Sequence, residues 1–439
     1  MAKFVIIGGK PLKGAVRVGG AKNAGFKLMI ASLLAEDESR LLDVSSIDDV
    51  HITKQVIESL GGRVESRGKG TIFINPLSIK APEINKGYGF KSRASIMFAA
   101  PLLSRFGKAV LPLPGGDQVG RRPVERHVEG LKALGAIAEY KNGQIMLTCP
   151  KLRGAEYRFA KNTHTGTETM IMAAVKAEGK TVLKNAAQEP EIDDLINYLN
   201  KMGGKIKRKP GRIIEINGVE KLKGTIYKVM PDRNEAVSYA CSALGTKGDI
   251  IIENLKSDIL EAFIEKVDQA GGNIEADNYG IRFWYNKPLR ATDIQTAPHP
   301  GYMTDWQPLW TTLMTQAKGI SEIRETIYEY RFGFVNDLVK MGAKIKLFNP
   351  KIADPNNFYN FNLEDDRPEY FHAAKVSGPT LLTGREMLVT DVRAGATMTL
   401  AALIAKGESV LTGIEHIDRG YEDLEGRLKQ LGADIKRVE

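Results

Sequence analysis

Hydrophobic positions along the chain follow one pattern that recurs from end to end. Segments with apolar residues spaced three and four apart finish in an apolar residue, a glycine and then a glycine or alanine, and a short segment that reads as a strand follows. This spacing marks one face of an α-helix, and a glycine commonly ends a helix. The pattern therefore predicts a helix, a tight turn and a β-strand. Its six copies are residues 60–64 (LGGRV), 134–137 (LGAI), 202–206 (MGGKI), 270–274 (AGGNI), 341–345 (MGAKI) and 431–435 (LGADI).

A second pattern lies between these copies. A strongly apolar helix leads through a short polar turn, usually with a glycine, into a strand, as in residues 98–111, 170–183 and 400–411. Each period of about 70 residues therefore holds two helices and several strands, and six periods predict a repeated α/β unit packed into compact lobes. The N-terminal residues 1–9 read as a first strand and not as a signal peptide, because their apolar part is too short.

The last period is about 20 residues longer than the others. The surplus falls in residues 348–372, which are rich in Asn, Asp and Pro, as loops are. We therefore interpret residues 348–372 as an insertion into the repeat.

Composition narrows the class of protein. The chain has 439 residues, of which 43% are hydrophobic and 26% charged, which is typical of a soluble globular protein of two or three domains. No apolar run reaches the roughly 18 residues that would span a bilayer. Two cysteines, Cys149 and Cys241, supply neither a disulfide framework nor zinc-ligand spacing. These features predict a cytoplasmic protein without a membrane span.

The net charge of +9 has three interpretations. It can reflect an ordinary basic surface, a nucleic-acid site such as residues 205–212 (KIKRKPGR), or the attraction of small anionic substrates. The basic segment lacks interleaved aromatic residues, and aromatics make up only 7% of the chain, which disfavours a base-stacking surface.

Residues 113–123 (LPGGDQVGRRP) form the most distinctive loop. Three glycines surround Asp117, and Arg121 and Arg122 precede Pro123 at the expected start of a helix. Glycines give a loop the backbone freedom to open and close. A helix N-terminus beside two arginines is suited to binding an anion. The loop alone is equally consistent with a surface turn.

Together with the sixfold repeat, an ordered set of motifs resembles the enolpyruvyl transferase family over nearly the whole chain, and its nucleotide-sugar branch more than its 3-phosphoshikimate branch. The motifs are residues 20–24 (GAKNA), 93–96 (RASI), 122–127 (RPVERH), 304–307 (TDWQ), 330–332 (YRF), 391–394 (DVRA) and 416–421 (HIDRGY). The resemblance implies an α/β fold, the two-lobed inside-out α/β barrel, in which each lobe has three βαβαββ units and the active site lies between the lobes. It implies one lobe of residues 22–229 and a second lobe of residues 1–21 with 230–439.

The implied activity is transfer of the enolpyruvyl group of phosphoenolpyruvate to the 3-hydroxyl of UDP-N-acetylglucosamine, with release of phosphate, in peptidoglycan precursor synthesis. The resemblance implies these two small molecules as partners and no metal or organic cofactor. Three alternatives remain open at this point: a related transferase with another acceptor, an RNA-binding or RNA-end-processing protein of related fold, and an inactive regulatory homologue. The sequence gives no oligomeric state.

The resemblance also assigns roles to residues. The implied catalytic residues are Asp117, Asp305, Lys22 and Arg419. The implied phosphoenolpyruvate-binding residues are Lys22, Asn23, Arg122, Arg331, Arg393 and Arg419. The implied residues for UDP-N-acetylglucosamine are Arg93, Arg122, Pro123, Val124, Glu125, Arg126, Asp305 and Ile327. The arginines suit this chemistry because a guanidinium matches the geometry of a carboxylate or phosphate.

Two departures from the family pattern affect these expectations. Asp117 stands where most bacterial members carry the cysteine that fosfomycin alkylates, so we expect this protein to be insensitive to fosfomycin. To donate a proton near neutral pH, Asp117 would need a pKa raised by about three units, which costs about 4 kcal/mol. We hypothesise that closure of the loop over the anionic donor raises the pKa of Asp117 by this amount. On the acceptor side, residues 162–169 (NTHTGTET) carry His164 and Glu168, which are unusual there, and residues 231–237 also diverge.

Overall fold

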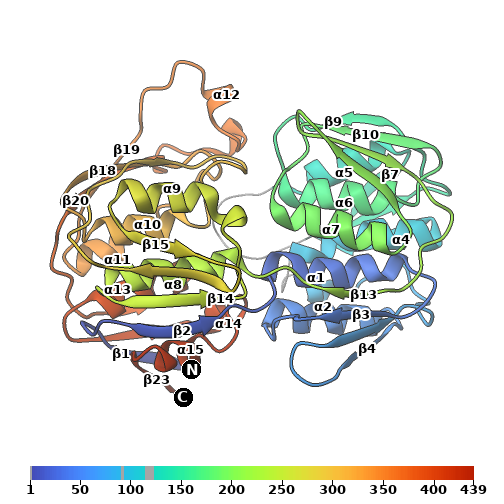
Figure 1. The fold of residues 1–439 in the computed structure, drawn as a ribbon. Coiled ribbons are helices and arrows are strands. Elements are labelled where there is room, and N and C mark those ends of the chain that lie inside the picture. Colours follow the sequence, from blue (N-terminus) through green and yellow to red (C-terminus); the bar gives the residue numbers. More distant parts are fainter. Residues whose placement is uncertain (1, 90–92, 114–122) are drawn as a thin grey trace. The chain divides into compact units, whose positions relative to one another are not determined.

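The computed structural model describes residues 2–89, 93–113 and 123–439. These residues divide into two compact units (Figure 1). The terminal unit consists of residues 2–19 and 231–439, and the central unit of residues 20–89, 93–113 and 123–230. Along the described residues, the chain passes into the central unit after residue 19 and returns to the terminal unit after residue 230.

The described residues of the terminal unit form three four-stranded sheets with one shared topology. In each, an edge strand pairs in parallel with its neighbour, and the other two pairings are antiparallel. In spatial order the first sheet is β2 (Lys13–Arg17), β14 (Asp249–Glu253), β16 (Gly280–Trp284) and β15 (Asn273–Ala276). The second is β17 (Ile294–Gln295), β18 (Gly319–Arg324), β20 (Ala373–Gly378) and β19 (Lys344–Phe348). The third is β21 (Glu386–Leu388), β22 (Glu408–Thr412), β1 (Lys3–Ile7) and β23 (Asp434–Val438).

The described residues of the central unit repeat this topology twice in full and once without the parallel edge strand. Its first sheet is β13 (Ile226–Lys228), β3 (Ser39–Leu42), β5 (Ile72–Asn75) and β4 (Arg63–Ser66). The next is β6 (Lys108–Pro112), β8 (Gln144–Thr148) and β7 (Ile137–Lys141), and the last is β9 (Glu156–Arg158), β10 (Lys180–Lys184), β12 (Ile213–Asn217) and β11 (Lys205–Lys209). The three-stranded sheet has a single parallel bridge, between Glu83 and Val110, at the edge where the other sheets have a strand.

Each repeat contributes an inner and an outer helix. The inner helices of the terminal unit are α8 (Arg233–Gly245), α10 (Gln307–Met314) and α13 (Val392–Ile404), and those of the central unit are α1 (Lys22–Ala31), α4 (Ala99–Phe106) and α6 (His164–Ala174). The outer helices are α9 (Glu261–Gln269), α11 (Val335–Lys340), α15 (Leu424–Gln430), α2 (Asp48–Ser59), α5 (Glu125–Ala133) and α7 (Pro190–Lys201). Short helical turns are η1 (Ser32–Leu34), η2 (Arg93–Phe98), η3 (Ser257–Leu260), η4 (Leu363–Asp365), α3 (Lys86–Gly89), α12 (Pro355–Phe358) and α14 (Glu415–Asp418).

The six predicted helix–turn–strand copies are confirmed. In every copy the outer helix ends two residues before the first glycine, whose φ lies between 78° and 110°, and a strand begins two residues after that glycine. This left-handed backbone conformation favours glycine because a Cβ atom would be strained there. The glycine recurs in the sequence because the turn of each repeat needs this backbone conformation.

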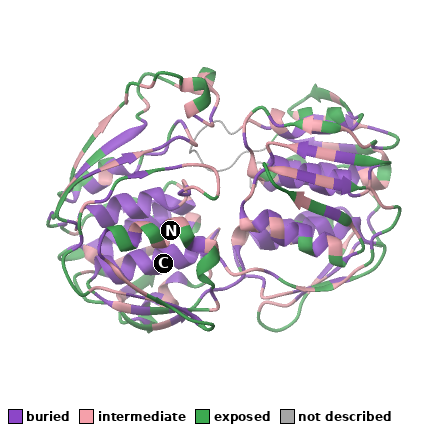
Figure 2. Cartoon of the chain, turned by 45° about the horizontal axis from the view of Figure 1, so that its top comes forward, coloured by how far each residue is buried: buried purple, intermediate pink, exposed green. Residues whose placement is uncertain are grey.

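The inner helices form the core of each unit, and Figure 2 shows them almost entirely in the colour of buried residues. All residues of α8 and α10 are buried, and only Ile404 of α13 is not. These three helices pack on one another, while sheets and outer helices cover them. A helix that is apolar on all sides is typical of such a central position.

Residues 349–372 connect the neighbouring strands β19 and β20. The equivalent connections between β4 and β5, β7 and β8, and β11 and β12 are short turns. Within the long connection, the rings of Tyr359 and Phe361 lie 5.0 and 5.1 Å from the imidazole of His372, and all three residues are buried. These contacts fix the segment against the start of β20. Among the described residues, no helix combines the length and the apolar character needed to cross a membrane.

Candidate active site

Several of the predicted site residues lie at the N-terminal ends of the inner helices. Lys22 and Asn23 are the first residues of α1, Arg93 opens the turn η2 that leads into α4, and Arg393 is the second residue of α13. Asp305 lies two residues before α10. A helix N-terminus carries a positive partial charge and unpaired N–H groups, both of which favour a negatively charged ligand. The charged side chains at these helix N-termini therefore lie where a negatively charged substrate would be stabilised.

In the terminal unit, Asp305 lies between two arginines that are distant in sequence. Its Oδ1 atom is 3.0 Å from Nη2 of Arg331, and its Oδ2 atom is 3.1 Å from Nη2 of Arg393. Both arginine side chains are more than nine-tenths buried, whereas the Asp305 side chain keeps 20% of its surface exposed. Asp305 is thus a partly exposed carboxylate that pairs with two buried guanidinium groups.

Two further residues, Asp391 and Tyr421, hold Arg393 in place. The side chain of Asp391 accepts hydrogen bonds from the backbone N–H groups of Arg393 and Ala394 and so caps α13. Nη1 of Arg393 donates to the hydroxyl of Tyr421, which also contacts the hydroxyl of Ser238. Burial disfavours the guanidinium charge, but Asp305, Tyr421 and Asp232 outweigh burial and raise the pKa of Arg393. Arg393 is therefore a fixed cation.

Glu325 organises the same region, although sequence reasoning did not identify it. Its fully buried carboxylate accepts hydrogen bonds from the Thr304 hydroxyl at 3.0 Å and from the backbone N–H groups of Ile327 and Tyr328 at 2.8 and 3.2 Å. Burial raises the pKa of Glu325, against the lowering effect of Arg331 and these donors. Glu325 thereby ties the segment that carries Asp305 to the segment that carries Ile327.

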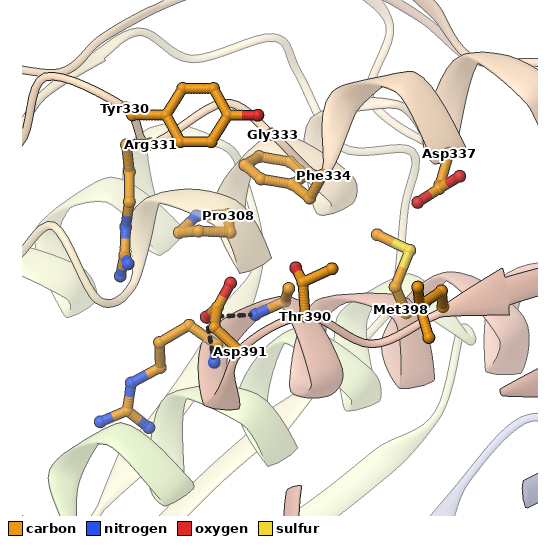
Figure 3. A pocket seen from close by; sticks show the side chains of 12 residues that line it. Pro308, Tyr330, Arg331, Gly333, Phe334, Asp337, Thr390, Asp391 and Met398 are labelled. Carbon is orange, nitrogen blue, oxygen red and sulfur yellow. Dashed lines mark hydrogen bonds between the residues drawn. The ribbon is translucent and has the colours of Figure 1, made fainter. Parts of the chain in front are cut away.

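A pocket of about 170 Å³ lies beside these arginines in the terminal unit. Its lining includes parts of Arg331, Arg393 and Asp391 together with apolar groups of Phe334 and Met398. Figure 3 shows Phe334 and Met398 on one side of the pocket and the Arg331 side chain on the other. The site region thus combines fixed charge with apolar surface.

The remaining predicted cation of the terminal unit, Arg419, follows directly after α14 and is half-buried. It lies two residues before Tyr421, the residue that contacts Arg393. The segment with Arg419 is therefore linked to the start of α13 through Tyr421.

In the central unit, Lys22 pairs with an acid from the neighbouring outer helix. Its Nζ atom lies 2.6 Å from Oδ2 of Asp49, which is 5% exposed, while 14% of the Lys22 side chain is exposed. The same ammonium group lies 5.6 Å from the centre of the Phe26 ring, and Nζ of Lys27 lies 5.8 Å from that ring. Two lysines of α1 thus share one aromatic neighbour.

A buried charged cluster joins α1 to α6. Nζ of Lys27 lies 2.6 Å from Oε2 of Glu168 and 3.2 Å from Nε2 of His164, and that nitrogen is 3.3 Å from Oε1 of Glu168. The Glu168 side chain is completely buried, and 3% of the Lys27 side chain and 21% of the His164 side chain are exposed. The unusual His164 and Glu168 of the sequence are therefore partners, together with a lysine that sequence reasoning missed.

The start of α5 carries the predicted residues Pro123, Val124, Glu125 and Arg126. Nη1 of Arg126 donates to the backbone carbonyl of Asn162, just before α6. His127 contacts the hydroxyls of Thr169 at 2.9 Å and Thr165 at 3.2 Å, and burial together with Arg93, Arg126 and Lys27 lowers its pKa to about 3. His127 is therefore a neutral link between α5 and α6.

Two predicted site residues, Asp117 and Arg122, lie outside the described residues. Within the terminal unit, the structure brings together Asp305, Arg331 and Arg393 and links Ile327 to them through Glu325. Within the central unit, Lys22 is linked to Lys27 through Phe26, and Arg126 to the start of α6.

Known proteins resemble this chain over its whole length. The family model of EPSP synthase (3-phosphoshikimate 1-carboxyvinyltransferase) matches residues 6–428. A protein of Halothermothrix orenii named UDP-N-acetylglucosamine 1-carboxyvinyltransferase is 40% identical over 438 residues, which cover 100% of both chains. A protein of the same name from Sorangium cellulosum is also 40% identical, and the match covers 100% of this chain and 99% of that protein.

Solved structures show the same architecture at lower sequence identity. The enolpyruvyl transferase NikO from Streptomyces tendae superposes with a TM-score of 0.86 at 22% identity, covering 100% of this chain and 99% of that one. EPSP synthase from Acinetobacter baumannii gives a TM-score of 0.73 at 19% identity, with 100% of both chains covered. These likenesses concern the fold.

Proposed function

Because the chain belongs to the enolpyruvyl transferase family and has the two-lobed α/β fold that the resemblance implied, we propose that it transfers the enolpyruvyl group of phosphoenolpyruvate to the 3-hydroxyl of UDP-N-acetylglucosamine. The full-length relatives named for this acceptor support the choice of substrate. Within the structure, the observation that carries the proposal is Asp305, a partly exposed carboxylate whose charge two buried arginines balance.

The proposed donor site uses cations because phosphoenolpyruvate carries a phosphate and a carboxylate. Each charge-assisted hydrogen bond contributes about 1.5–3 kcal/mol, and several are needed to replace the hydration of both groups. The proposed donor-binding residues are Lys22, Asn23, Arg122, Arg331, Arg393 and Arg419. The buried settings of Arg331 and Arg393 support this role, since their guanidinium groups are already desolvated and fixed.

The proposed acceptor site uses residues at the start of α5 and around Asp305. These residues are Arg93, Arg122, Pro123, Val124, Glu125, Arg126, Asp305 and Ile327. The hydrogen bonds of Glu325 support the last two assignments, because they hold the segments with Asp305 and Ile327 in a fixed relation.

The proposed reaction has two steps. Asp305 accepts the proton of the 3-hydroxyl while the hydroxyl oxygen attacks carbon 2 of the donor, and Asp117 gives a proton to carbon 3. In the second step the bond from carbon 2 to the phosphate oxygen breaks, carbon 3 returns its proton to Asp117, and phosphate leaves with the proton that Asp305 took. Lys22 and Arg419 stabilise the negative charge on the departing phosphate.

The test is acceptor-dependent release of phosphate. Purified protein is mixed with phosphoenolpyruvate, with and without UDP-N-acetylglucosamine, and phosphate is measured together with the enolpyruvyl product by mass spectrometry. We expect phosphate and product to form in equal amounts, only when both substrates are present. The variants Asp305→Asn and Lys22→Met should lose turnover, while Asp258→Asn and Lys69→Met, exposed positions in the same two units, should not.

Absence of phosphate release with both substrates present would refute the proposal. Release with a different nucleotide sugar but not with UDP-N-acetylglucosamine would refute the acceptor assignment alone. We place the reaction in the cytoplasm, where both phosphorylated substrates are found, with the two small molecules as the partners.

A further inference from the structure

We propose that Asn234 is a positioning residue for Asp305 and that it acts through the indole of Trp306. Its side chain completes a closed circuit of buried hydrogen bonds that holds the Asp305 carboxylate against Arg393. The inference rests on the proposed function, because it takes Asp305 to be the base of the reaction. Asn234 belongs to residues 231–237, a segment that diverges from the family pattern and contributes no proposed substrate contact.

The first link of the circuit joins the indole of Trp306 to the carboxamide of Asn234. Nε1 of Trp306 lies 2.8 Å from Oδ1 of Asn234, and the two residues are 1% and 2% exposed. An indole nitrogen can only donate, so the carboxamide has to present its oxygen to it. Because an N–H group buried without a partner is destabilising, this hydrogen bond selects one orientation of the indole.

Neighbouring side chains hold the Trp306 ring on its other sides. The rings of Tyr302 and Phe263 meet it edge to face, with centroids 5.6 and 6.0 Å away, and Cζ of Arg233 lies 5.5 Å from its centre. Trp306 stands between Asp305 and the first residue of α10. Since Trp306 and Asp305 share a peptide bond, a fixed indole also fixes the backbone that carries the carboxylate.

A chain of hydroxyl groups leads from Asn234 back to Arg393. The Ser238 hydroxyl donates to the backbone carbonyl of Asn234 at 3.1 Å, one turn earlier in α8. A serine hydroxyl has one hydrogen, so the Tyr421 hydroxyl, 2.8 Å away, is the donor to Ser238. Nη1 of Arg393 donates in turn to Tyr421 at 3.3 Å. Each hydroxyl therefore accepts one hydrogen bond and donates one, and the chain runs in a single direction.

The ion pair between Arg393 and Asp305, with 3.1 Å between Nη2 and Oδ2, closes the circuit. Its members come from α8, from α13, from the turn before α10 and from the segment after α14, and they are Asn234, Trp306, Asp305, Arg393, Tyr421 and Ser238. All except Asp305 are less than one-tenth exposed, whereas 20% of the Asp305 side chain is exposed. The circuit thus ends at its one member that a substrate can reach.

A buried polar circuit is not what packing alone would favour. The helices α8, α10 and α13 pack on one another, and apolar side chains can join such helices without the cost of burying polar groups. A polar network whose members are all satisfied instead specifies one arrangement of its groups. Here that arrangement includes the proposed base and its cation. Precise placement matters for a base, because a displacement of about 1 Å can lower the rate about 100-fold.

The circuit can be cut at two links that should give different kinetics. Asn234→Leu removes the side-chain acceptor but keeps the backbone carbonyl that receives Ser238, so the contacts of Arg393 remain. We expect kcat to fall about 10-fold while KM for phosphoenolpyruvate stays unchanged. Tyr421→Phe removes the hydroxyl that receives Arg393, so KM for phosphoenolpyruvate should rise about fivefold. A general loosening of the unit would change both variants in the same way.

Trp306→Phe cuts the same link as Asn234→Leu without altering α8, so it tests the inference even if Asn234→Leu does not fold. Its kcat should also fall about 10-fold, and the double variant should lose about 10-fold and not 100-fold, because only one link is lost. Asn278→Leu and Trp284→Phe, at positions of the same unit outside the circuit, are the matched controls and should keep the wild-type kcat. Circular dichroism and the melting temperature report folding for every variant.

Wild-type kcat in folded Asn234→Leu or Trp306→Phe would overturn the inference. A raised KM for phosphoenolpyruvate in Asn234→Leu, or a multiplied loss in the double variant, would overturn it as well. These results would leave the proposed function intact, because the wild-type protein releases phosphate in the same assay. Absence of phosphate release by the wild-type protein would instead remove the proposed function and, with it, the role of Asn234.

Discussion

Arg393 and Asp305 are 88 residues apart in the chain, yet Nη2 of the arginine lies 3.1 Å from Oδ2 of the aspartate. One residue belongs to the first turn of α13 and the other to the turn before α10. The pair therefore joins two inner helices of the terminal unit at their N-terminal ends, and it places a carboxylate and a guanidinium group side by side.

Asp305→Asn tests the base. An amide keeps the size of the side chain but cannot accept the hydroxyl proton, so we expect kcat to fall by about 100-fold or more. Phosphate release under saturating substrates measures this effect. Because Arg331 and Arg393 lose their counter-charge, the melting temperature should fall as well. An Asp305→Asn protein with unchanged kcat would show that another group takes the proton.

Arg393→Lys tests the requirement for a guanidinium. A lysine keeps the charge but cannot contact Asp305 and Tyr421 while also presenting further donors, so we expect KM for phosphoenolpyruvate to rise about 10- to 100-fold. Initial rates over a range of donor concentrations give this value. The exposed Arg385 of the same unit provides the control, and Arg385→Lys should leave KM unchanged. Equal effects of the two substitutions would contradict the assignment of Arg393.

The response to fosfomycin depends on Asp117, which lies outside the described residues. A carboxylate is a poor nucleophile toward an epoxide compared with a thiolate, so we expect no covalent adduct and no time-dependent inactivation. Mass spectrometry of the intact protein after incubation with the drug measures the adduct. Asp117→Cys should gain one equivalent of label. Stoichiometric labelling of the wild-type protein would refute the expectation.

The stability of the central unit should depend on pH because the pKa of Asp194, in α7, is raised in the folded protein. Burial raises its pKa to about 6, although hydrogen bonds from the Tyr227 hydroxyl and the Met230 N–H group lower it. The folded protein then binds more protons than the unfolded chain between about pH 4 and pH 6, so the free energy of unfolding falls by about 3 kcal/mol as the pH rises through this window.

The measurement for Asp194 has to report on the central unit. All three tryptophans, Trp284, Trp306 and Trp310, belong to the terminal unit, so tryptophan fluorescence would miss the effect. Hydrogen exchange of the α7 amides at pH 4.5 and pH 6.5 is suitable. The difference in protection between the two pH values should be smaller in Asp194→Asn than in the wild-type protein. An identical difference in both proteins would assign the pH dependence to other groups.

The fold was predictable because its signal is local and repeated. Each copy of the helix–turn–strand pattern has a glycine in the left-handed backbone conformation, such as Gly61 and Gly342, whose φ values are 96° and 110°. The apolar segments at residues 170–175 and 400–404 correctly predicted the inner helices α6 and α13. Such patterns need no knowledge of distant contacts.

The contacts of the site were less predictable because they join distant repeats. Asp305 was assigned by its motif, but nothing in the sequence indicates that Arg331 and Arg393 contact it. Lys27 was missed because a lysine within a helix is ordinarily solvent-exposed, and only the fully buried Glu168 explains its position. Glu325 was missed because its partner Thr304 lies 21 residues earlier in the chain, on a separate segment.

The third sheet of the terminal unit has a consequence for how the protein is made. Its strand β1, from the start of the chain, lies between β22 and β23, which are formed by residues 408–412 and 434–438. During synthesis on the ribosome, residues 20–230 can complete the central unit while β1 still has neither of its neighbours. Strand β1 must therefore remain without either neighbour until the residues of β22 and β23 have been added.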